Sequence, residues 1–341
     1  MNEDIPRSVV WQGGELRLLD QRKLPHVEEY RLCNSIDDVF DAIKTLTVRG
    51  APAIGIAAAY GLLVDYDDSA EMTGGFGARC DFLISARPTA VNLAWAVERM
   101  RSRYLSLGAS SDRMTQLEEE ARAIHREDAD ACRAIADVGL RIVTSNPRVL
   151  THCNAGSLAV SELGTALAPI YRAHEDGISV HVYVDETRPL LQGARLTAYE
   201  LYRNGIDCTL ISDNMAAHIM SEGHVDMVLV GADRIAANGD TANKIGTLNL
   251  AILCQYFSIP FYVAAPVSTI DAGTERGGDI VIEERDPEEV KRFAGIDVAP
   301  SQVKARSPAF DVTPNNLIAG IMTERGLLEA PFNRSIRAVV D

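Results

Sequence analysis

Residues 148–156 read RVLTHCNAG, and this stretch decides the fold of the second half of the chain. It contains a short apolar run, 149–153, that ends in a polar turn with a glycine. Similar runs follow at 180–184, 208–212, 227–231 and 261–264, with helical patterns between them at 196–204, 214–222 and 245–257. Strands that alternate with helices over short connections are typical of a parallel sheet covered on both faces. We therefore predict an α/β domain over residues 146–341.

The first 145 residues have a different pattern, which predicts a mainly helical domain after a short β opening at 9–11 and 16–19. Apolar residues recur at helical spacing, and prolines stand at helix-start positions. The expected helices are 37–46, 51–64, 88–100 and a long amphipathic helix over 112–143. A chain of 341 residues exceeds the usual size of one hydrophobic core, so we expect two domains, 1–145 and 146–341.

The composition excludes several classes of protein. The formal net charge is -15, whereas a protein that binds duplex nucleic acid needs a basic face, so we expect no nucleic-acid partner. The longest apolar stretch, 51–64, is too short to span a membrane, and the N-terminus lacks the basic and apolar regions of a secretory signal. Six scattered cysteines without a C-x-x-C pair favour reduced thiols, and we expect a cytoplasmic protein.

Small or polar residues follow all five predicted strands, at 153–156, 185–188, 212–214, 231–234 and 265–269. Each segment alone has a structural explanation as a helix cap. Together they predict a functional crevice, because ligands bind beyond the carboxyl ends of the strands of an open parallel sheet. No G-x-G-x-x-G, G-x-x-x-x-G-K-[ST] or H-E-x-x-H motif occurs in a suitable context. We therefore expect no cofactor and no metal ion.

Cys153 differs from the other cysteines, which lie in apolar patterns typical of core residues. It ends a predicted strand before a turn and a helix expected at 157–163, whose N-terminus would favour a thiolate. The position fits a catalytic thiol and a structural residue equally well. His152 stands next to it, but neighbouring strand residues point to opposite faces, so a packed histidine is the favoured interpretation over a thiolate–imidazole pair.

Asp233 ends the apolar run 228–232 and enters a pocket that we expect to be largely dry. Burial raises the pKa of a carboxyl group, which would allow Asp233 to donate a proton near neutral pH. The structural alternatives are a helix cap or an ion pair with Arg234. Asp185 and Asp213 present the same choice, and we treat both as supporting residues.

Anion recognition has a pattern of its own, in which basic side chains stand at expected helix starts. Arg49 precedes the helix that Pro52 begins, Arg87 stands before Pro88, and Asn243-Lys244 is expected to open the helix after Asp233. Helix N-termini with adjacent cations are natural anion sites. One such arginine is more often a solvated surface residue, but three sites in an acidic protein predict phosphate binding.

The chain resembles the methylthioribose-1-phosphate isomerase family in motifs spread over residues 8–326. They are VRGAPAIG at 48–55, RPTAVNL at 87–93, THCNAG at 151–156, DETRP at 185–189, QGAR at 192–195, GADR at 231–234, NGDTANKIGT at 238–247 and FDVTP at 310–314. This family shares its fold with ribose-1,5-bisphosphate isomerases and with regulatory subunits of the guanine-nucleotide exchange factor for translation initiation.

The resemblance implies a homodimer with a helical N-terminal domain and a Rossmann-like C-terminal domain without a nucleotide. It implies an aldose–ketose isomerase of methionine salvage that converts 5-methylthioribose 1-phosphate to 5-methylthioribulose 1-phosphate. Asp233 would be the proton donor, and Cys153 would stabilise the transition state or relay a proton. The implied substrate-binding residues are Arg49, Gly50, Ala51, Arg87, Gln192, Asn243 and Lys244.

Two alternatives stay open at this stage. One is an isomerase of 5-deoxyribose 1-phosphate or ribose 1,5-bisphosphate with the same chemical pair. A second phosphate would need another basic cluster, to which Arg188 and Arg195 could contribute. The other is a non-catalytic regulatory subunit, which would need neither Cys153 nor Asp233.

Overall fold

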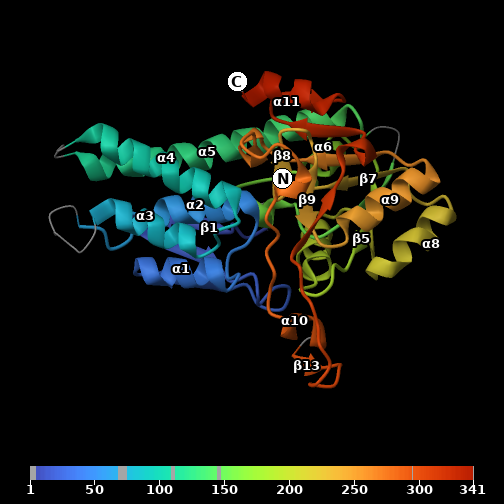
Figure 1. The fold of residues 1–341 in the computed structure, drawn as a ribbon, viewed down its shortest axis with the longest axis horizontal. Coiled ribbons are helices and arrows are strands. Elements are labelled where there is room, and N and C mark those ends of the chain that lie inside the picture. The colour runs from blue at the N-terminus through green and yellow to red at the C-terminus, as the bar shows by residue number, and fades with distance from the viewer. Residues whose placement is uncertain (1–4, 68–74, 109–111, 144–146, 294, 341) are drawn as a thin grey trace.

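The computed structural model describes residues 5–67, 75–108, 112–143, 147–293 and 295–340. In Figure 1 the N-terminal helices lie on the left and a sheet flanked by helices lies on the right. The long helix α5 (Arg113–Leu140) connects the two halves, since its first turns pack in one hydrophobic cluster and its last turns in another. Residues 1–4, where the secretory signal is expected to be absent, and the expected domain boundary at 145 lie outside the described residues.

In the N-terminal half, the other helices pack around a buried central helix, α2. An antiparallel sheet of β1 (Val9–Gln12), β2 (Glu15–Leu19) and β3 (Tyr30–Cys33) precedes α1 (Ile36–Lys44), α2 (Ala51–Gly61), α3 (Gly75–Ser85) and α4 (Val91–Leu107). Helix α2 is rich in alanine and glycine, so its neighbours approach closely. A Cβ at Gly55 would lie 2.7 Å from the Asn92 carbonyl oxygen. The N-terminus of this central helix points to the site described below.

Seven strands form the main sheet, in the order β16-β15-β10-β7-β4-β5-β6. They are β4 (Arg148–Thr151), β5 (His181–Asp185), β6 (Cys208–Ile211), β7 (Met227–Val230), β10 (Phe261–Ala264), β15 (Gly320–Thr323) and β16 (Gly326–Leu328). Every neighbouring pair is parallel except β15 and β16. The five predicted strands and their parallel arrangement are confirmed.

Helices cover both faces of this sheet, as the pattern predicts. Helices α5, α6 (Ala168–Glu175) and α7 (Ala198–Arg203) share one buried cluster with the strands. Helices α8 (Ala216–Ser221), α9 (Thr247–Phe257) and α11 (Phe332–Val340) share another. Short helical turns are η1 (Ser157–Ala159), η2 (Gly193–Thr197), η3 (Asp213–Met215), η4 (Val267–Thr269), η5 (Gly277–Asp279) and η6 (Asn315–Leu317).

A smaller sheet, of order β11-β8-β9-β14, lies beside the carboxyl ends of the main strands. Its strands are β8 (Arg234–Ala236), β9 (Thr241–Lys244), β11 (Ile270–Asp271) and β14 (Phe310–Thr313). An arm made of α10 (Glu288–Lys291), β12 (Arg292–Phe293) and β13 (Ile296–Asp297) projects from the body at the bottom of Figure 1.

Two predicted helix starts are wrong. Asn243 and Lys244 end strand β9, because Asn238-Gly239 turns the chain from β8 into an antiparallel partner, and α9 begins only at Thr247. Helix α4 begins at Val91 rather than at Pro88, because the Ala90 amide donates to the Arg87 carbonyl in a turn, at 3.0 Å.

Within the described ranges, none of the helices is long and apolar enough to cross a membrane. All six cysteines lie in those ranges and carry free thiols, and only Cys208 among them is partly exposed.

Candidate active site

Two adjoining pockets at the carboxyl ends of the parallel strands bring together every residue that the sequence predicts for the site. Those residues are Arg49, Gly50, Ala51, Arg87, Cys153, Gln192, Asp233, Asn243 and Lys244. Cys153 and Asp233 line both pockets, so the two side chains share one cavity. Both halves of the chain contribute to it. The site therefore exists only where the N-terminal half meets the main sheet.

A larger cavity of about 410 Å³ lies beside these pockets, between α2, α4 and α5. Among the described residues that line it are four acidic ones and no lysine or arginine. This lining does not suit a phosphate, so the smaller pockets are the better candidate site for an anionic ligand.

The backbone holds Cys153 in an uncommon conformation directly after β4. Its φ is 60°, in the left-handed region that non-glycine residues rarely adopt. The Cys153 amide donates to Thr187 Oγ1 at 2.8 Å, and the Cys153 carbonyl accepts from Thr197 Oγ1 at 2.6 Å. These two threonines fix the turn that presents the thiol to the pocket, where Cys153 is 8% exposed.

The expectation that a helix N-terminus favours a Cys153 thiolate is wrong. Burial raises the pKa of the thiol, although Arg49 and Lys244 act in the opposite direction. The expected helix is only the single turn η1, and its amides are already occupied. The buried Glu200 carboxylate accepts from the amides of Ser157 and Leu158, at 2.6 and 3.2 Å. The surroundings of Cys153 therefore favour the thiol over the thiolate.

Asp233 lies between β7 and β8, where its amide donates to the Ala242 carbonyl at 3.0 Å. Burial raises the pKa of its carboxyl group, against the lowering effect of Lys244, Arg87 and Arg49. The raised pKa that the sequence predicts is confirmed. The alternative ion pair with Arg234 is wrong, because that guanidinium reaches Asp271 and the Thr89 carbonyl instead.

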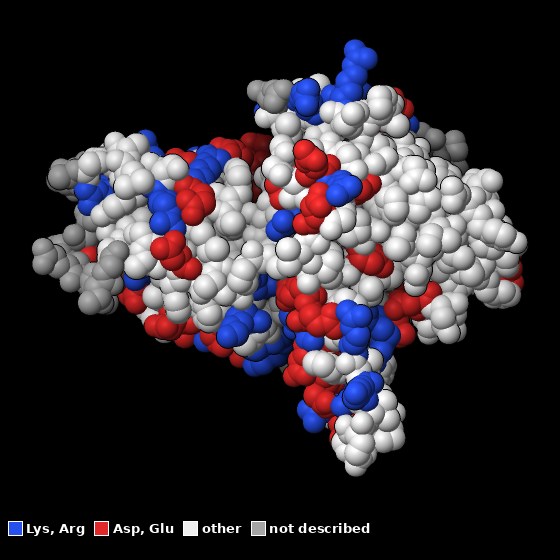
Figure 2. Space-filling view, in the orientation of Figure 1, with Lys and Arg blue, Asp and Glu red and all other residues white. Residues whose placement is uncertain are grey.

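Three cations surround the thiol and the carboxyl group. Arg49 donates to the side chain and the carbonyl of Asn154, and Arg87 forms an ion pair with Glu283 at 2.8 Å. Lys244 Nζ donates to the Ala309 carbonyl at 3.1 Å, and burial lowers its pKa. In Figure 2 basic side chains gather where the helical half meets the arm. A concentrated cationic pocket in an acidic protein fits a phosphorylated ligand.

The remaining predicted residues supply neutral polar groups and free backbone amides. Gln192 is 95% buried and its Oε1 has no hydrogen-bond partner, while Asn243 donates to Thr247 Oγ1 at 3.0 Å. Gly50 has φ 100° and precedes the first turn of α2. A Cβ there would lie 2.3 Å from the Ala159 carbonyl oxygen, so only glycine lets the helix N-terminus approach η1 this closely.

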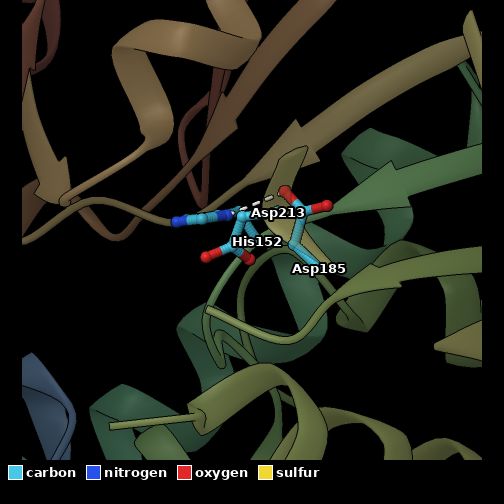
Figure 3. A group of neighbouring side chains, drawn as sticks. All are labelled: His152, Asp185 and Asp213. Atoms are coloured by element: carbon cyan, nitrogen blue, oxygen red, sulfur yellow. Dashed lines mark hydrogen bonds and ion pairs between the residues drawn. The ribbon is translucent and has the colours of Figure 1, made fainter. Parts of the chain in front are cut away.

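His152 does not pair with the Cys153 thiol. This agrees with the favoured interpretation of the sequence, in which His152 is a packed histidine. Figure 3 shows its ring beside Asp185, with Nδ1 2.9 Å from Asp185 Oδ2. Asp213 completes the group, and its oxygens accept from the amides of Thr187 and Arg188. The three side chains offer atoms within 4.8 Å of one another, as a metal site would. However, both ring nitrogens and both Asp213 oxygens already have partners, so this group does not fit a metal ion.

The sequence did not identify the buried network that supports the site. Asn154 donates to the Glu200 carboxylate at 2.8 Å and in turn accepts from Arg49, so Glu200 helps to position the Arg49 guanidinium. The detectable signal is a single acidic residue on the otherwise buried face of a helix, which is rarely left without partners. Glu283 was also missed, because it lies far from Arg87 in the sequence and no local pattern joins them.

Comparison with known proteins places this fold and site in a class. The model of the "Initiation factor 2 subunit family" matches residues 47–330, a range that contains every residue that the sequence predicts for the site. The fold and the site therefore define a member of that family.

Relatives and solved structures narrow the assignment. The methylthioribose-1-phosphate isomerase of Bacillus cytotoxicus is 48% identical over 99% of this chain and 98% of its own length. The crystal structure of 5-methylthioribose 1-phosphate isomerase from Pyrococcus horikoshii OT3 (Form II) has a TM-score of 0.90 and 42% identity, over 99% of this chain and 96% of that one. The structure named translation initiation factor eIF-2B, subunit delta, from A. fulgidus has a TM-score of 0.84 and 40% identity, over 98% and 100%. Within the wider family, this chain belongs to the methylthioribose-1-phosphate isomerases.

Proposed function

We propose that the protein is an aldose–ketose isomerase that converts 5-methylthioribose 1-phosphate to 5-methylthioribulose 1-phosphate in methionine salvage. The observation that carries the proposal is the shared cavity of Cys153 and Asp233, with three cations around it. The names of the close relatives support the same reaction.

The chemistry of this substrate requires an acid. Its phosphate is on the anomeric oxygen, so the ring cannot open by simple collapse of a hemiacetal. We propose that protonated Asp233 delivers its proton to the ring oxygen while Cys153 serves the C1–C2 centre, where hydrogen moves from C2 to C1. The 2-hydroxyl group gives up its proton as the ketone forms, and that proton restores the acid form of Asp233, so the reaction consumes no net proton. Burial supports both roles, because it raises the pKa of the carboxyl group and of the thiol and so favours their protonated forms.

The phosphate has a natural place among the cations and free amides. We propose that Arg49, Arg87 and Lys244 bind it together with the backbone of Gly50 and Ala51 at the start of α2. Arg87 would then exchange Glu283 for the phosphate. Gln192 and Asn243 are proposed to bind sugar hydroxyl groups, which suits the unpaired Gln192 Oε1.

The bisphosphate alternative has less support from the pocket. Arg188 donates to the Val290 carbonyl and Arg195 to the carbonyls of Gln21 and Leu24, so neither is presented to a second phosphate. Arg285 lines the pocket, but Glu283 and Glu289 pair with it. The regulatory-subunit alternative does not account for a buried thiol and a carboxyl group in one cavity.

Three further parts of the proposal concern the whole molecule. We propose a cytoplasmic homodimer, in line with the resemblance and the free thiols. We also propose that the chain divides into a helical domain, 1–145, and a Rossmann-like domain, 146–341. The hydrophobic clusters support two separate cores, but the change from one core to the other falls within α5, between Ile124 and Cys132, before the proposed boundary.

The test is turnover of four 1-phosphorylated riboses that carry methylthio, hydrogen, hydroxyl or phosphate at C5, with the ketose product identified by NMR. The methylthio substrate should have the highest kcat/KM. A preference for the bisphosphate would select the alternative isomerase, and no turnover of any of the four would favour the regulatory subunit. Cys153→Ser keeps the shape of the side chain but not its acidity, so full activity of that variant would reduce Cys153 to a packing residue.

A further inference from the structure

The pair of His152 and Asp185 is the most completely buried ionisable pair among the described residues of the main sheet. Both side chains are 1% exposed. His152 is among the residues that line the pocket, and Asp185 lies behind it. The proposed reaction uses neither group. A buried ionisable pair is costly unless it is well paired and hydrogen-bonded, so its presence calls for a physical account.

The second ring nitrogen of His152 shows where the pair acts. His152 Nε2 lies 2.8 Å from the carbonyl oxygen of Ile245, which can only accept a hydrogen bond. Nε2 therefore carries a proton and donates it to that carbonyl. Ile245 directly follows Asn243 and Lys244 and precedes the N-terminus of α9. The imidazole thus connects the strand end that bears Cys153 with the turn that directly follows two proposed substrate ligands in β9.

The turn around Ile245 is built to receive this ring. Gly246 has φ 103°, and a Cβ there would lie 2.9 Å from both Cε1 and Nε2 of His152. Asp311 accepts from the amides of Gly246 and Leu248, at 2.8 and 3.0 Å, on the other side of the turn. The Ile245 amide donates to the Ala309 carbonyl at 3.0 Å. The ring and Asp311 therefore hold the turn between them.

We propose that His152, oriented by Asp185, is a positioning residue that holds the turn of residues 245–246 at the end of β9, so that Asn243 and Lys244 in the last two positions of that strand face the pocket. The role of those two residues as substrate ligands rests on the proposed function. The positioning itself does not, since it concerns only the turn and the ring.

The charges around the ring support a doubly protonated imidazole. Burial alone would lower the pKa of His152, but the hydrogen bond and charge of Asp185, the Ile245 carbonyl and the charge of Asp213 raise it above the ordinary value. Asp311 is the third carboxyl group that interacts with the ring through its charge. Because each ring nitrogen has a hydrogen-bond partner, Asp185 on one side and the Ile245 carbonyl on the other, the ring has one fixed orientation.

Two variants separate the two hydrogen bonds. In His152→Asn the side-chain amide replaces Nδ1 and keeps the bond to Asp185, but nothing reaches Ile245. In His152→Gln the amide replaces Nε2 and keeps the bond to Ile245, but Asp185 loses its partner. His181→Asn is the matched control, because His181 pairs with Asp207 at 2.7 Å at the opposite edge of the sheet.

The first measurement is amide hydrogen exchange of the whole protein without ligand, read at residues 245–250. We expect His152→Asn to raise exchange there about tenfold, as the loss of one hydrogen bond would. His152→Gln and His181→Asn should leave that segment protected. Equal exchange in the Asn and Gln variants, or unchanged exchange in both, would overturn the proposal.

The second measurement is steady-state kinetics of the same variants with methylthioribose 1-phosphate. His152→Asn should raise KM about tenfold with a smaller effect on kcat, and His152→Gln should keep KM within about threefold of the parent protein. A general loss of kcat in both variants with unchanged KM would contradict positioning. If the parent protein has no activity, the proposed function fails, while the exchange data still decide the role of His152.

Discussion

The two edges of the main sheet carry similar ion pairs in opposite surroundings. Strand β5 has a histidine–aspartate pair at each end. At the carboxyl edge, His152 and Asp185 are both 1% exposed. At the amino edge, the side chains of His181 and Asp207 are 25% and 80% exposed, although the pair is shorter, at 2.7 Å. The two pairs are similar in hydrogen-bond length, but they differ in how far their side chains are exposed to water.

Access to water determines how much the ion pair at each edge contributes to stability. An exposed ion pair contributes little to stability, because each partner is almost as well solvated without the other. When one partner of a buried ion pair is removed, no water is present to solvate the charge that remains. The carboxyl edge is therefore the part of the molecule where single charges have large effects on both chemistry and stability, and the following experiments test that difference.

The largest effect is expected at Asp233. Asp233→Asn removes the proposed proton donor and keeps the shape of the side chain, so kcat should fall about 10²–10⁴-fold with little change in KM. Steady-state kinetics provides the measurement. Asp226→Asn is the control at the amino edge, where Asp226 pairs with Arg148 at 2.6 Å, and it should leave kcat unchanged. Near-normal turnover of Asp233→Asn would remove Asp233 from the mechanism.

The next effect concerns stability at the carboxyl edge. Asp185→Ala leaves the imidazole of His152 buried without its partner, which should lower the free energy of unfolding by about 3–5 kcal/mol. Urea unfolding followed by circular dichroism measures the change. A loss as small as that of an exposed pair would show that water or a neighbouring group replaces Asp185.

The pH dependence of kcat is the third test. A proton donor works only while it is protonated, and the pKa of Asp233 is raised above its ordinary value of 3.8. Activity should therefore persist to higher pH than a solvated aspartate allows. It should then fall about tenfold per pH unit as the pH rises through the raised pKa. An acidic limb assigned to the same carboxyl group, with activity rising on its deprotonation, would instead make Asp233 a base.

The smallest effect is expected at the amino edge. Asp207→Ala removes the partner of His181 in a largely solvated pair, so the free energy of unfolding should change by only about 0.2–1 kcal/mol. Kinetic constants should stay the same. A loss comparable to that of Asp185→Ala in parallel urea titrations would remove the distinction between the two edges.

The sequence predicts the part of the molecule that depends on local patterns. Apolar runs mark the central strands, and the residues that end them converge because parallel strands share one carboxyl edge. The helix starts assigned to Pro88 and Asn243 were wrong for local reasons. Proline also fits the turn before a helix. Asn238-Gly239 is a hairpin signal, and it turns the chain from β8 into β9 before any helix can begin. Strands β15 and β16 and helix α3 were not anticipated either.

The electrostatics of the site were harder to predict. A raised pKa for Asp233 follows from the apolar run before it. The pKa of Cys153 is raised chiefly by burial, and Glu200 occupies the amides that would have stabilised a thiolate. That contact joins residues on different elements, as do the bonds from Arg87 to Glu283 and from His152 to Ile245. One sequence contains no signal for such distant pairs.

The contact between Gly50 and Ala159 also determines when the pocket can form during synthesis. The segment that carries Arg49, Gly50 and Arg87 leaves the ribosome before strand β4 has been translated. These proposed phosphate-binding residues therefore lack the part of the pocket that follows β4. The nascent N-terminal half should consequently capture no sugar phosphate. Ligand can stabilise only the finished chain, after the main sheet has been translated and has docked against α2.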